Sequence, residues 1–215
     1  MELTVHNSKG EKTKRTVTLN DEIFNVEPND HAIYLDVKQH LANRRQGTHK
    51  AKQRNEIHGS TKKLHKQKGT GGSRKGDIKS PIFRGGGRIF GPQPRDYSFK
   101  VNKKTKVVAR ISALSQKAKN NSIMVLEDFN FEDPKTKNYV ELLGNLELNG
   151  KKTLLVTNSN DKNIALSARN LKSAMVTSVN SLNTYDIMNA NNVLFLESSV
   201  KAIETILLNT NTSEA

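Results

Sequence analysis

A basic, glycine-rich stretch in the middle of the sequence concentrates residues that could bind a negatively charged ligand. It reads "GSTKKLHKQKGTGGSRKGDIKSPIFRGGGRIFGPQP" over residues 59–94. Residues 44–95 contain fifteen Lys or Arg but only two acids, Glu56 and Asp77, so this segment carries +13 of the formal net charge of +14. Lys and Arg bind phosphate oxygens, and Arg can bind two of them at once. The chemistry that this stretch favours is therefore binding to a polyanion.

Nucleic acid is the first candidate for that polyanion, and an anionic membrane is the second. The same segment holds ten of the thirteen glycines, which let a backbone pass close to a sugar-phosphate wall. A membrane-binding protein would need a basic amphipathic helix or a span of about 18 apolar residues, and the sequence has neither. The absence of cysteine excludes disulfides and thiolate metal sites, and the first ten residues lack the apolar region of a secretory signal. We therefore expect a cytoplasmic protein with no membrane partner.

Glycine spacings within the basic segment were tested against the nucleotide-binding loops of enzymes. Gly71 and Gly76 have the spacing of a phosphate-binding loop, but Asp77 follows where such a loop needs Lys. Gly69 and Gly71 fit the start of a dinucleotide-binding pattern, but Arg74 stands where its third glycine is needed. Neither pattern predicts an active site, and we expect no cofactor.

Candidate metal ligands and acid–base groups are also explained more simply. The histidines of the basic segment, His49, His58 and His65, have no cysteines or paired acids at metal-ligand spacing. Three carboxylates lie close together after a predicted strand: Asp128, Glu132 and Asp133. A carboxylate pair could do acid–base work, but helix capping explains the same spacing. We expect no catalytic residues and no metal site, so the protein is not predicted to be an enzyme.

Outside the basic segment, apolar periodicity predicts alternating strands and helices. Short apolar, β-branched runs indicate strands over 122–128, 152–158, 173–179 and 192–197. Helical patterns cover 29–45, 102–119, 133–146, 161–171, 184–190 and 198–208. We expect Asn29 or Asp30, Asp133, and Ser198 or Ser199 to cap three of these helices, with Pro134 at a first helical position.

This order of elements predicts the fold class and the domain organisation. Strands that alternate with helices favour an α/β fold with a mostly parallel sheet and helices on both of its faces. The first twenty residues suggest a strand or hairpin at the sheet edge. We expect one globular α/β domain, residues 1–43 and 101–215, with a long basic extended loop, residues 44–100, inserted into it. With few apolar side chains, that loop is predicted to be disordered in the free protein.

Four sequence blocks resemble a known family. "RRQGT" (44–48), "KQKGTGGSR" (66–74), "IKSPIFRGGG" (78–87) and "VNKK" (101–104) are similar, in order and spacing, to the bacterial large-subunit ribosomal protein L-four family. Each block alone is a weak signal, but the set is specific, and the α/β remainder fits as well. One departure is "LHKQKGTG", where many family members carry "PWRQKGTG", so Leu64 and His65 differ from the usual residues.

The resemblance implies a function, a set of partners and a location for the loop. It implies a structural component of the large ribosomal subunit that binds ribosomal RNA directly and early in assembly. The globular domain would lie on the outside of the subunit, and the loop would reach inward to the wall of the nascent-peptide exit tunnel. The implied partners are the large-subunit ribosomal RNA, neighbouring ribosomal proteins, and the nascent peptide at the loop tip.

Charge and resemblance together give two sets of candidate site residues. The predicted RNA-binding residues are the cations of the loop and of the segment that follows it: Arg44, Arg45, Lys50, Lys52, Arg54, Lys62, Lys63, Lys66, Lys68, Arg74, Lys75, Lys79, Arg84, Arg88, Arg95, Lys103 and Lys104. The predicted tunnel tip is Leu64, His65, Lys66, Gln67, Lys68, Gly69, Thr70, Gly71, Gly72 and Ser73.

Two other functions remain open from the sequence. One is a free RNA-binding regulator, which could act on its own messenger RNA and whose basic segment folds on its target. The other is an α/β enzyme with an incidental basic segment.

Overall fold

The computed structural model describes residues 1–159 and 161–212. Residues 160 and 213–215, which the expected domain also includes, lie outside this part. Contacts divide the chain into two compact units, one made of residues 1–41 and 100–215 and the other of residues 42–99. The first unit is called the domain here and the second the arm.

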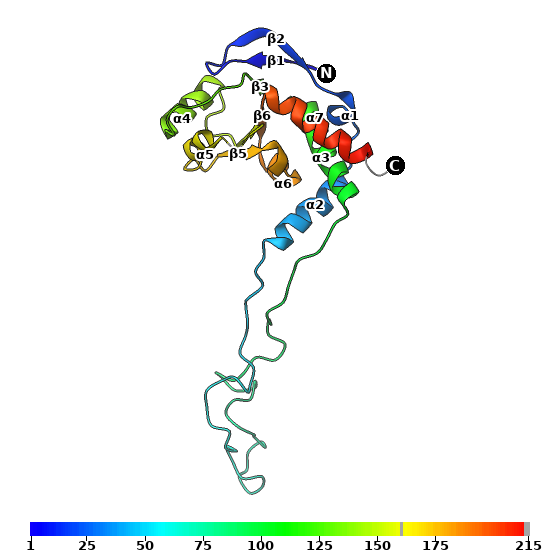
Figure 1. The fold of residues 1–215 in the computed structure, drawn as a ribbon. Coiled ribbons are helices and arrows are strands. Elements are labelled where there is room, and N and C mark those ends of the chain that lie inside the picture. Colours follow the sequence, from blue (N-terminus) through cyan, green and yellow to red (C-terminus); the bar gives the residue numbers. More distant parts are fainter. Residues whose placement is uncertain (160, 213–215) are drawn as a thin grey trace. The chain divides into compact units, whose positions relative to one another are not determined.

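The domain is built on one six-stranded sheet with the strand order β2-β1-β3-β6-β4-β5 (Figure 1). The pair at one edge, β1 and β2, is antiparallel, and every other neighbouring pair is parallel. The predicted mostly parallel sheet is therefore confirmed, as is the hairpin at its edge. The strands are β1 (Glu2–His6), β2 (Lys12–Thr18), β3 (Ile123–Leu126), β4 (Thr153–Thr157), β5 (Ala174–Ser178) and β6 (Asn192–Leu196).

Helices cover both faces of this sheet, as the alternation of buried residues along the central strands requires. Val193 and Phe195 of β6 belong to one apolar cluster, and Leu194 and Leu196 belong to another. The first cluster packs against α1, α2, α3, α6 and α7, and the second packs against α4 and α5. The helices are α1 (Asp21–Phe24), α2 (Asp30–Asn43), α3 (Lys103–Lys119), α4 (Thr136–Asn145), α5 (Lys162–Ala168), α6 (Thr184–Asn189) and α7 (Glu197–Thr212), with a short 3-10 helix at Val179–Ser181.

Serines of α3 hold the start of α2 against the core. The Ser115 hydroxyl donates to the carbonyl of Ile23 (2.7 Å) and accepts from the N–H of Val26 (3.2 Å). The Ser112 hydroxyl accepts from the N–H of Asn29 (3.1 Å), whose own side chain accepts from the N–H of Ala32. Asn29 therefore caps α2, as expected. These bonds satisfy backbone groups that burial would otherwise leave unpaired, and they fix the two helices between which the arm is inserted.

Two predicted helix starts are wrong. The backbone of Lys135 is extended, and its N–H donates to the carbonyl of Asp133. Helix α4 therefore begins at Thr136 rather than at Pro134. Asp133 therefore does not cap α4 with its side chain.

Helix α7 begins at Glu197, directly after β6, so neither Ser198 nor Ser199 is its N-cap. The carboxylate of Asp128 accepts the N–H (3.2 Å) and the hydroxyl (2.9 Å) of Ser198 instead. Asp128, which follows β3, thus accepts hydrogen bonds from the first turn of α7, where a negative charge is favourable. Capping explains Asp128, although the helix that it caps is a distant one in sequence.

The aromatic centre of the domain gives a stability prediction. Phe195 is fully buried and packs edge-on against Phe24, with ring centroids 6.4 Å apart. Phe195→Ala should lower the free energy of unfolding by about 3–5 kcal/mol, because it removes a large buried ring and leaves a cavity. Val140→Ala, at an exposed position of α4, should change it by no more than about 0.5 kcal/mol. Urea unfolding followed by circular dichroism measures both, and equal effects would contradict this account of the core.

Candidate nucleic-acid interface

The arm consists of an outgoing and a returning limb that are joined by backbone hydrogen bonds without forming a regular strand. Arg95 N–H donates to Gly47 C=O (3.2 Å), and Ala51 N–H donates to Pro92 C=O (2.9 Å). Further along, Arg88 N–H donates to Lys52 C=O (3.0 Å), and Leu64 N–H donates to Gly76 C=O (3.0 Å). These bonds keep the limbs in register, so that cations far apart in sequence lie across from one another.

An aromatic ring holds two predicted RNA-binding cations together where the limbs begin. The guanidinium carbons of Arg45 and Arg95 lie 3.7 and 4.3 Å from the ring centroid of Tyr97. The Tyr97 hydroxyl is 3.2 Å from Nε2 of His49. This cation–π contact occupies the guanidinium groups with an aromatic ring and not with an acid, so their N–H groups can still donate to phosphate.

The backbone conformation at position 47 requires glycine. Its φ is +66°, and a Cβ there would lie 2.0 Å from the carbonyl oxygen of Arg95. A residue with a side chain would therefore be strained in its backbone and would collide with the partner limb. We call the group Arg45, Gly47, His49, Arg95 and Tyr97 the neck.

Midway along the arm, an ion pair links the limbs. Nη2 of Arg54 is 3.0 Å from Oδ1 of Asp77, which is a close charge contact, although it lacks the alignment of a hydrogen bond. Gly87 packs so closely on this point that a Cβ would lie 2.4 Å from the backbone nitrogen of Arg54. Asp77 and Gly87 are the buried residues of the arm, whose residues are all described, and no apolar side chain in it is buried.

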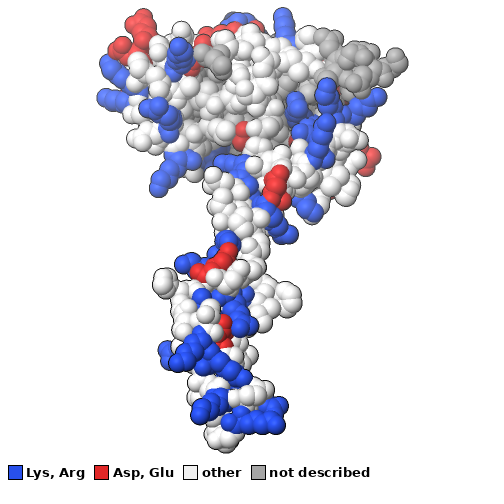
Figure 2. All heavy atoms as spheres, turned by 60° about the horizontal axis from the view of Figure 1, so that its bottom comes forward, with Lys and Arg blue, Asp and Glu red and all other residues white. Residues whose placement is uncertain are grey.

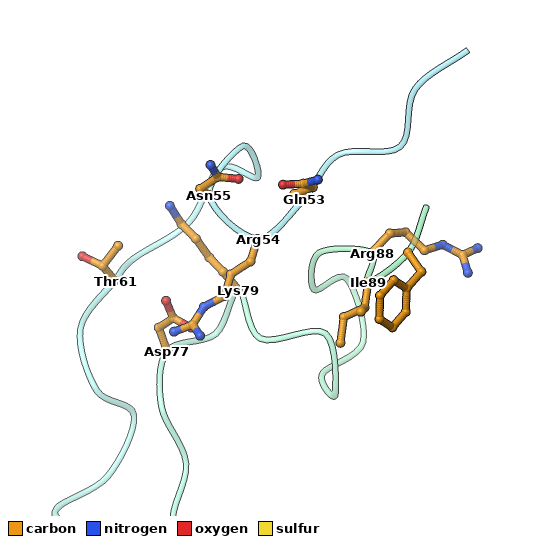
Figure 3. A pocket seen from close by; sticks show the side chains of 9 residues that line it. Gln53, Arg54, Asn55, Thr61, Asp77, Lys79, Arg88 and Ile89 are labelled. Atoms are coloured by element: carbon orange, nitrogen blue, oxygen red, sulfur yellow. The ribbon is translucent and has the colours of Figure 1, made fainter. Parts of the chain in front are cut away.

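A hollow of about 730 Å³ lies between the limbs beside this ion pair (Figure 3). Figure 3 shows Arg54, Asp77 and Lys79 together, with Arg88 and Ile89 on another part of the returning limb. Three of the predicted RNA-binding cations thus share one hollow with uncharged polar groups. Its lining consists of Gln53, Arg54, Asn55, Thr61, Asp77, Lys79, Arg88, Ile89 and Phe90.

The predicted tip, residues 64–73, is exposed throughout. Gly69 and Gly71 have φ of +84° and +69°, which suits a turn that most residues cannot make, whereas Gly72 is not in that region. A second, more basic hollow of about 420 Å³ lies next to the tip. It is lined by Arg54, Thr61, Lys63, Gln67, Arg74, Lys75, Gly76 and Asp77.

The arm's acids are engaged by neighbouring groups. Hydrogen bonds from Lys50 and from the backbone of Gln53 lower the pKa of Glu56. Backbone and hydroxyl hydrogen bonds from Ser98 lower the pKa of Asp96. With Asp77 paired to Arg54, the acids stabilise local structure and leave the arm strongly positive. Figure 2 shows Lys and Arg side chains along the arm, with few Asp or Glu among them.

The structure places fifteen of the predicted RNA-binding residues in the arm and the other two, Lys103 and Lys104, in the first turn of α3. Both of these lysines are exposed, and that turn has no acid. Positive charge at a helix N-terminus is unfavourable for the helix itself. The helix dipole therefore does not account for these two lysines.

Sequence reasoning missed Tyr97 as a residue of the interface. The available signal was that it is the one tyrosine of residues 44–100, set two residues after Arg95.

His58 and His65 are exposed in the arm, and His49 belongs to the neck. Within the described residues, no group of three or more His, Cys, Asp or Glu is placed to hold a metal ion. In the same part of the chain, no helix is long and apolar enough to cross a membrane.

An α/β domain with a basic arm that lacks an apolar core is typical of nucleic-acid-binding proteins. Comparison with known proteins is more specific: the chain belongs to the ribosomal protein L4/L1 family, whose model matches residues 17–206. It is 60% identical over 208 residues to the large ribosomal subunit protein uL4 of Bacteroides fragilis, covering 97% of this chain and all of the relative. The proteins of the same name from Cytophaga hutchinsonii and Porphyromonas gingivalis are 60% and 55% identical, each over 96% of this chain and 100% and 99% of the relative.

The resemblance seen in the four sequence blocks is therefore confirmed at the level of the family. Membership in a family of ribosomal proteins also agrees with the expectation that the chain is not an enzyme.

The neck gives a testable prediction about the pairing of the limbs. Gly47→Ala should open the bond between Arg95 N–H and Gly47 C=O, since a left-handed backbone costs a residue with a side chain about 1–2 kcal/mol before any collision. In the RNA-bound protein, where the arm is expected to be ordered, hydrogen exchange at the Arg95 amide should then become roughly 5- to 30-fold faster, which is that cost expressed as a rate ratio. Gly72→Ala is the control, because nothing lies within 4 Å of its Cβ position. Unchanged exchange in Gly47→Ala would refute the role given to the neck.

Proposed function

We propose that this chain is a structural component of the large ribosomal subunit and binds ribosomal RNA mainly through its arm. The names of its relatives support the assignment to the large subunit. The observation that carries the RNA-binding role is the arm itself, which bears fifteen cations and buries no apolar side chain. The protein would act at the ribosome in the cytoplasm.

Phosphates would supply the stabilisation that the arm lacks by itself. Ordering a residue costs about 1–2 kcal/mol of backbone entropy, and the arm has no apolar core to offset that cost. Cations on both limbs can contact phosphates on several sides of a segment that passes between RNA helices. The arm would then be held along its length, and the expected disorder of the free arm stays a prediction.

The tip is proposed to line the nascent-peptide exit tunnel, as the family resemblance implies. Its residues are exposed, and Lys66 and Lys68 lie on either side of Gln67 near the turn at Gly69. Placed beside a water-filled passage, these charges would set the local potential met by a passing peptide. The limb cations and the tip cations would therefore have separate roles, the first in holding the arm and the second in the tunnel.

Early binding during subunit assembly follows from the same mechanism. An arm enclosed by RNA helices has to be in place before those helices close around it. The exposed surface of the domain would then remain available to neighbouring large-subunit proteins.

Binding to ribosomal RNA should depend steeply on salt. If 6–10 of the arm's cations contact phosphates, affinity should fall by roughly 10³- to 10⁵-fold between 50 and 200 mM salt, because bound counterions are released on binding. Filter binding of the purified protein to deproteinised large-subunit RNA measures this slope. A flat response would exclude the arm as the main binding element.

Deletion of residues 48–94 is the matched test of the arm. The residues that this deletion joins, Gly47 and Arg95, are already hydrogen-bonded at 3.2 Å, so the cut closes without stretching the chain. The variant should lose most of its affinity for the RNA but retain the cooperative unfolding of the domain, whose apolar clusters lie outside the arm. Retained affinity would place RNA binding in the domain instead.

The separate roles of limbs and tip can be tested with two charge reversals. Lys68→Glu should leave mature large subunits abundant but alter the sensitivity of translation to macrolides that bind in the tunnel. Arg84→Glu, in the returning limb, should reduce assembly first, because it replaces a phosphate contact with repulsion. Sucrose-gradient profiles and drug inhibition are measured for both. The division is wrong if Lys68→Glu blocks assembly as severely as Arg84→Glu and its surviving ribosomes respond normally to the drug.

A further inference from the structure

Three residues bulge out of the returning limb. On the outgoing limb, Ala51 and Lys52 are neighbours, but their cross-limb bonds reach residues that are four apart, Pro92 and Arg88. Ile89, Phe90 and Gly91 are therefore extra residues between two closed hydrogen bonds. A bulge of this kind re-aims side chains away from the paired backbone. We call residues 89–91 the bulge.

The bulge presents an aromatic ring to solvent in an unusual conformation. Phe90 is fully exposed and has a φ of +54°, and Ile89 is exposed beside it. A positive φ is rare for a bulky residue and calls for an explanation. At Gly91 a Cβ would lie 2.6 Å from the Cβ of Ala51, so the bulge is held tightly at its base.

Other aromatic residues of the arm already have partners in the protein. The ring of Tyr97 has the guanidinium carbons of Arg45 and Arg95 within 4.3 Å of its centroid, and Lys75 lies 5.7 Å from the ring centroid of Phe83. Phe90 instead lines the hollow of about 730 Å³ together with Arg54, Lys79 and Arg88. The side-chain amides of Gln53 and Asn55 line the same hollow.

This combination selects a particular ligand chemistry. A flat, apolar ring can stack on a nucleobase, and cations can bind the phosphates next to that base. Side-chain amides can form hydrogen bonds with the edge of the base. We propose that Phe90 stacks on an unpaired base of the large-subunit RNA, with Arg54, Lys79 and Arg88 contacting the adjoining phosphates. The inference rests on the proposed RNA-binding function and adds a base-binding site to it.

The base has to be unpaired or at the end of a helix, since a base within a duplex has both faces covered by its neighbours. Stacking tolerates any base, because each has a π face, so the ring of Phe90 itself recognises exposed bases rather than a sequence. A protein segment would be a poorer occupant, because its backbone is neutral and the hollow is lined by three cations and one acid, Asp77, which is already paired.

The absence of tryptophan from the chain allows a direct test. Phe90→Trp gives a protein whose tryptophan emission comes from the bulge alone. Binding to deproteinised large-subunit RNA of Bacteroides fragilis should quench that emission and shield the indole from acrylamide. Ile82→Trp is the matched control, because Ile82 is exposed in the same arm but does not line the hollow. The surrounding RNA can shield its tryptophan from acrylamide as well, but this tryptophan should lack the strong quenching of emission that stacking on a base gives.

Affinity gives an independent second measurement. Phe90→Gly removes the ring but suits the positive φ, and it should weaken RNA binding by roughly 5- to 150-fold, the range found for loss of one stacked aromatic residue. Phe90→Tyr should bind like the wild type, and so should Ile82→Ala.

Failure can be assigned to one of the two proposals. Normal RNA affinity with an indole at position 90 that stays accessible, or a Phe90→Gly variant that binds as tightly as the wild type, would overturn the base-binding site and leave the RNA-binding function intact. An indole that is shielded only in assembled subunits would mean that a protein covers Phe90, which also overturns the site. Absence of RNA binding by the wild type would overturn both.

Discussion

Mutual repulsion among the cations of the arm is the constraint on which the rest of its structure depends. Fifteen positive side chains lie within residues 44–95, and like charges at this density oppose any close approach of two limbs. The limbs nevertheless run in register, because four backbone hydrogen bonds, the Arg54–Asp77 pair and the ring of Tyr97 hold them at intervals. Each of these contacts is small: a backbone hydrogen bond contributes about 1 kcal/mol net, and the ion pair joins a buried Asp77 to a largely exposed Arg54. The pairing therefore favours one path for the arm and leaves its charge available for a polyanion.

The domain differs from the arm, because its stability comes from the burial of apolar side chains on both faces of a sheet. Central strands such as β4 and β6 send alternate residues into the two clusters, so each strand supports both layers of helices. The arm enters the sequence between α2 and α3, whose inner residues belong to one of these clusters. An insertion at this point removes no core residue. This separation allows the sequence of the arm to be shaped by its ligand rather than by packing.

The aromatic residues of the arm fall into two groups: some contact other residues of the arm, and one is fully exposed. Tyr97 positions Arg45 and Arg95 from within, and Phe83 lies near Lys75. Phe90, at a bulge between two cross-limb bonds, faces solvent instead. Three nearby glycines, Gly85, Gly86 and Gly87, lie at a turn of the returning limb. Of these, Gly87 has no room for a side chain beside Arg54. Close approach between the limbs thus explains some of the glycines of the arm. For those glycines, close approach to an RNA backbone is not needed as an explanation.

The sequence by itself determined the fold class, the position of most elements, the basic segment and the family. These follow from local signals: apolar periodicity marks strands and helices, and charge and glycine content mark the arm. Only the tertiary structure decided that β6 lies between β3 and β4, that Asp128 caps α7, that Tyr97 joins two arginines, and that Phe90 is extruded. Each of these depends on pairing between residues far apart in the chain. A local pattern states which groups need a partner, but the partner is set by strand order and limb register, which depend on the packing of the whole fold.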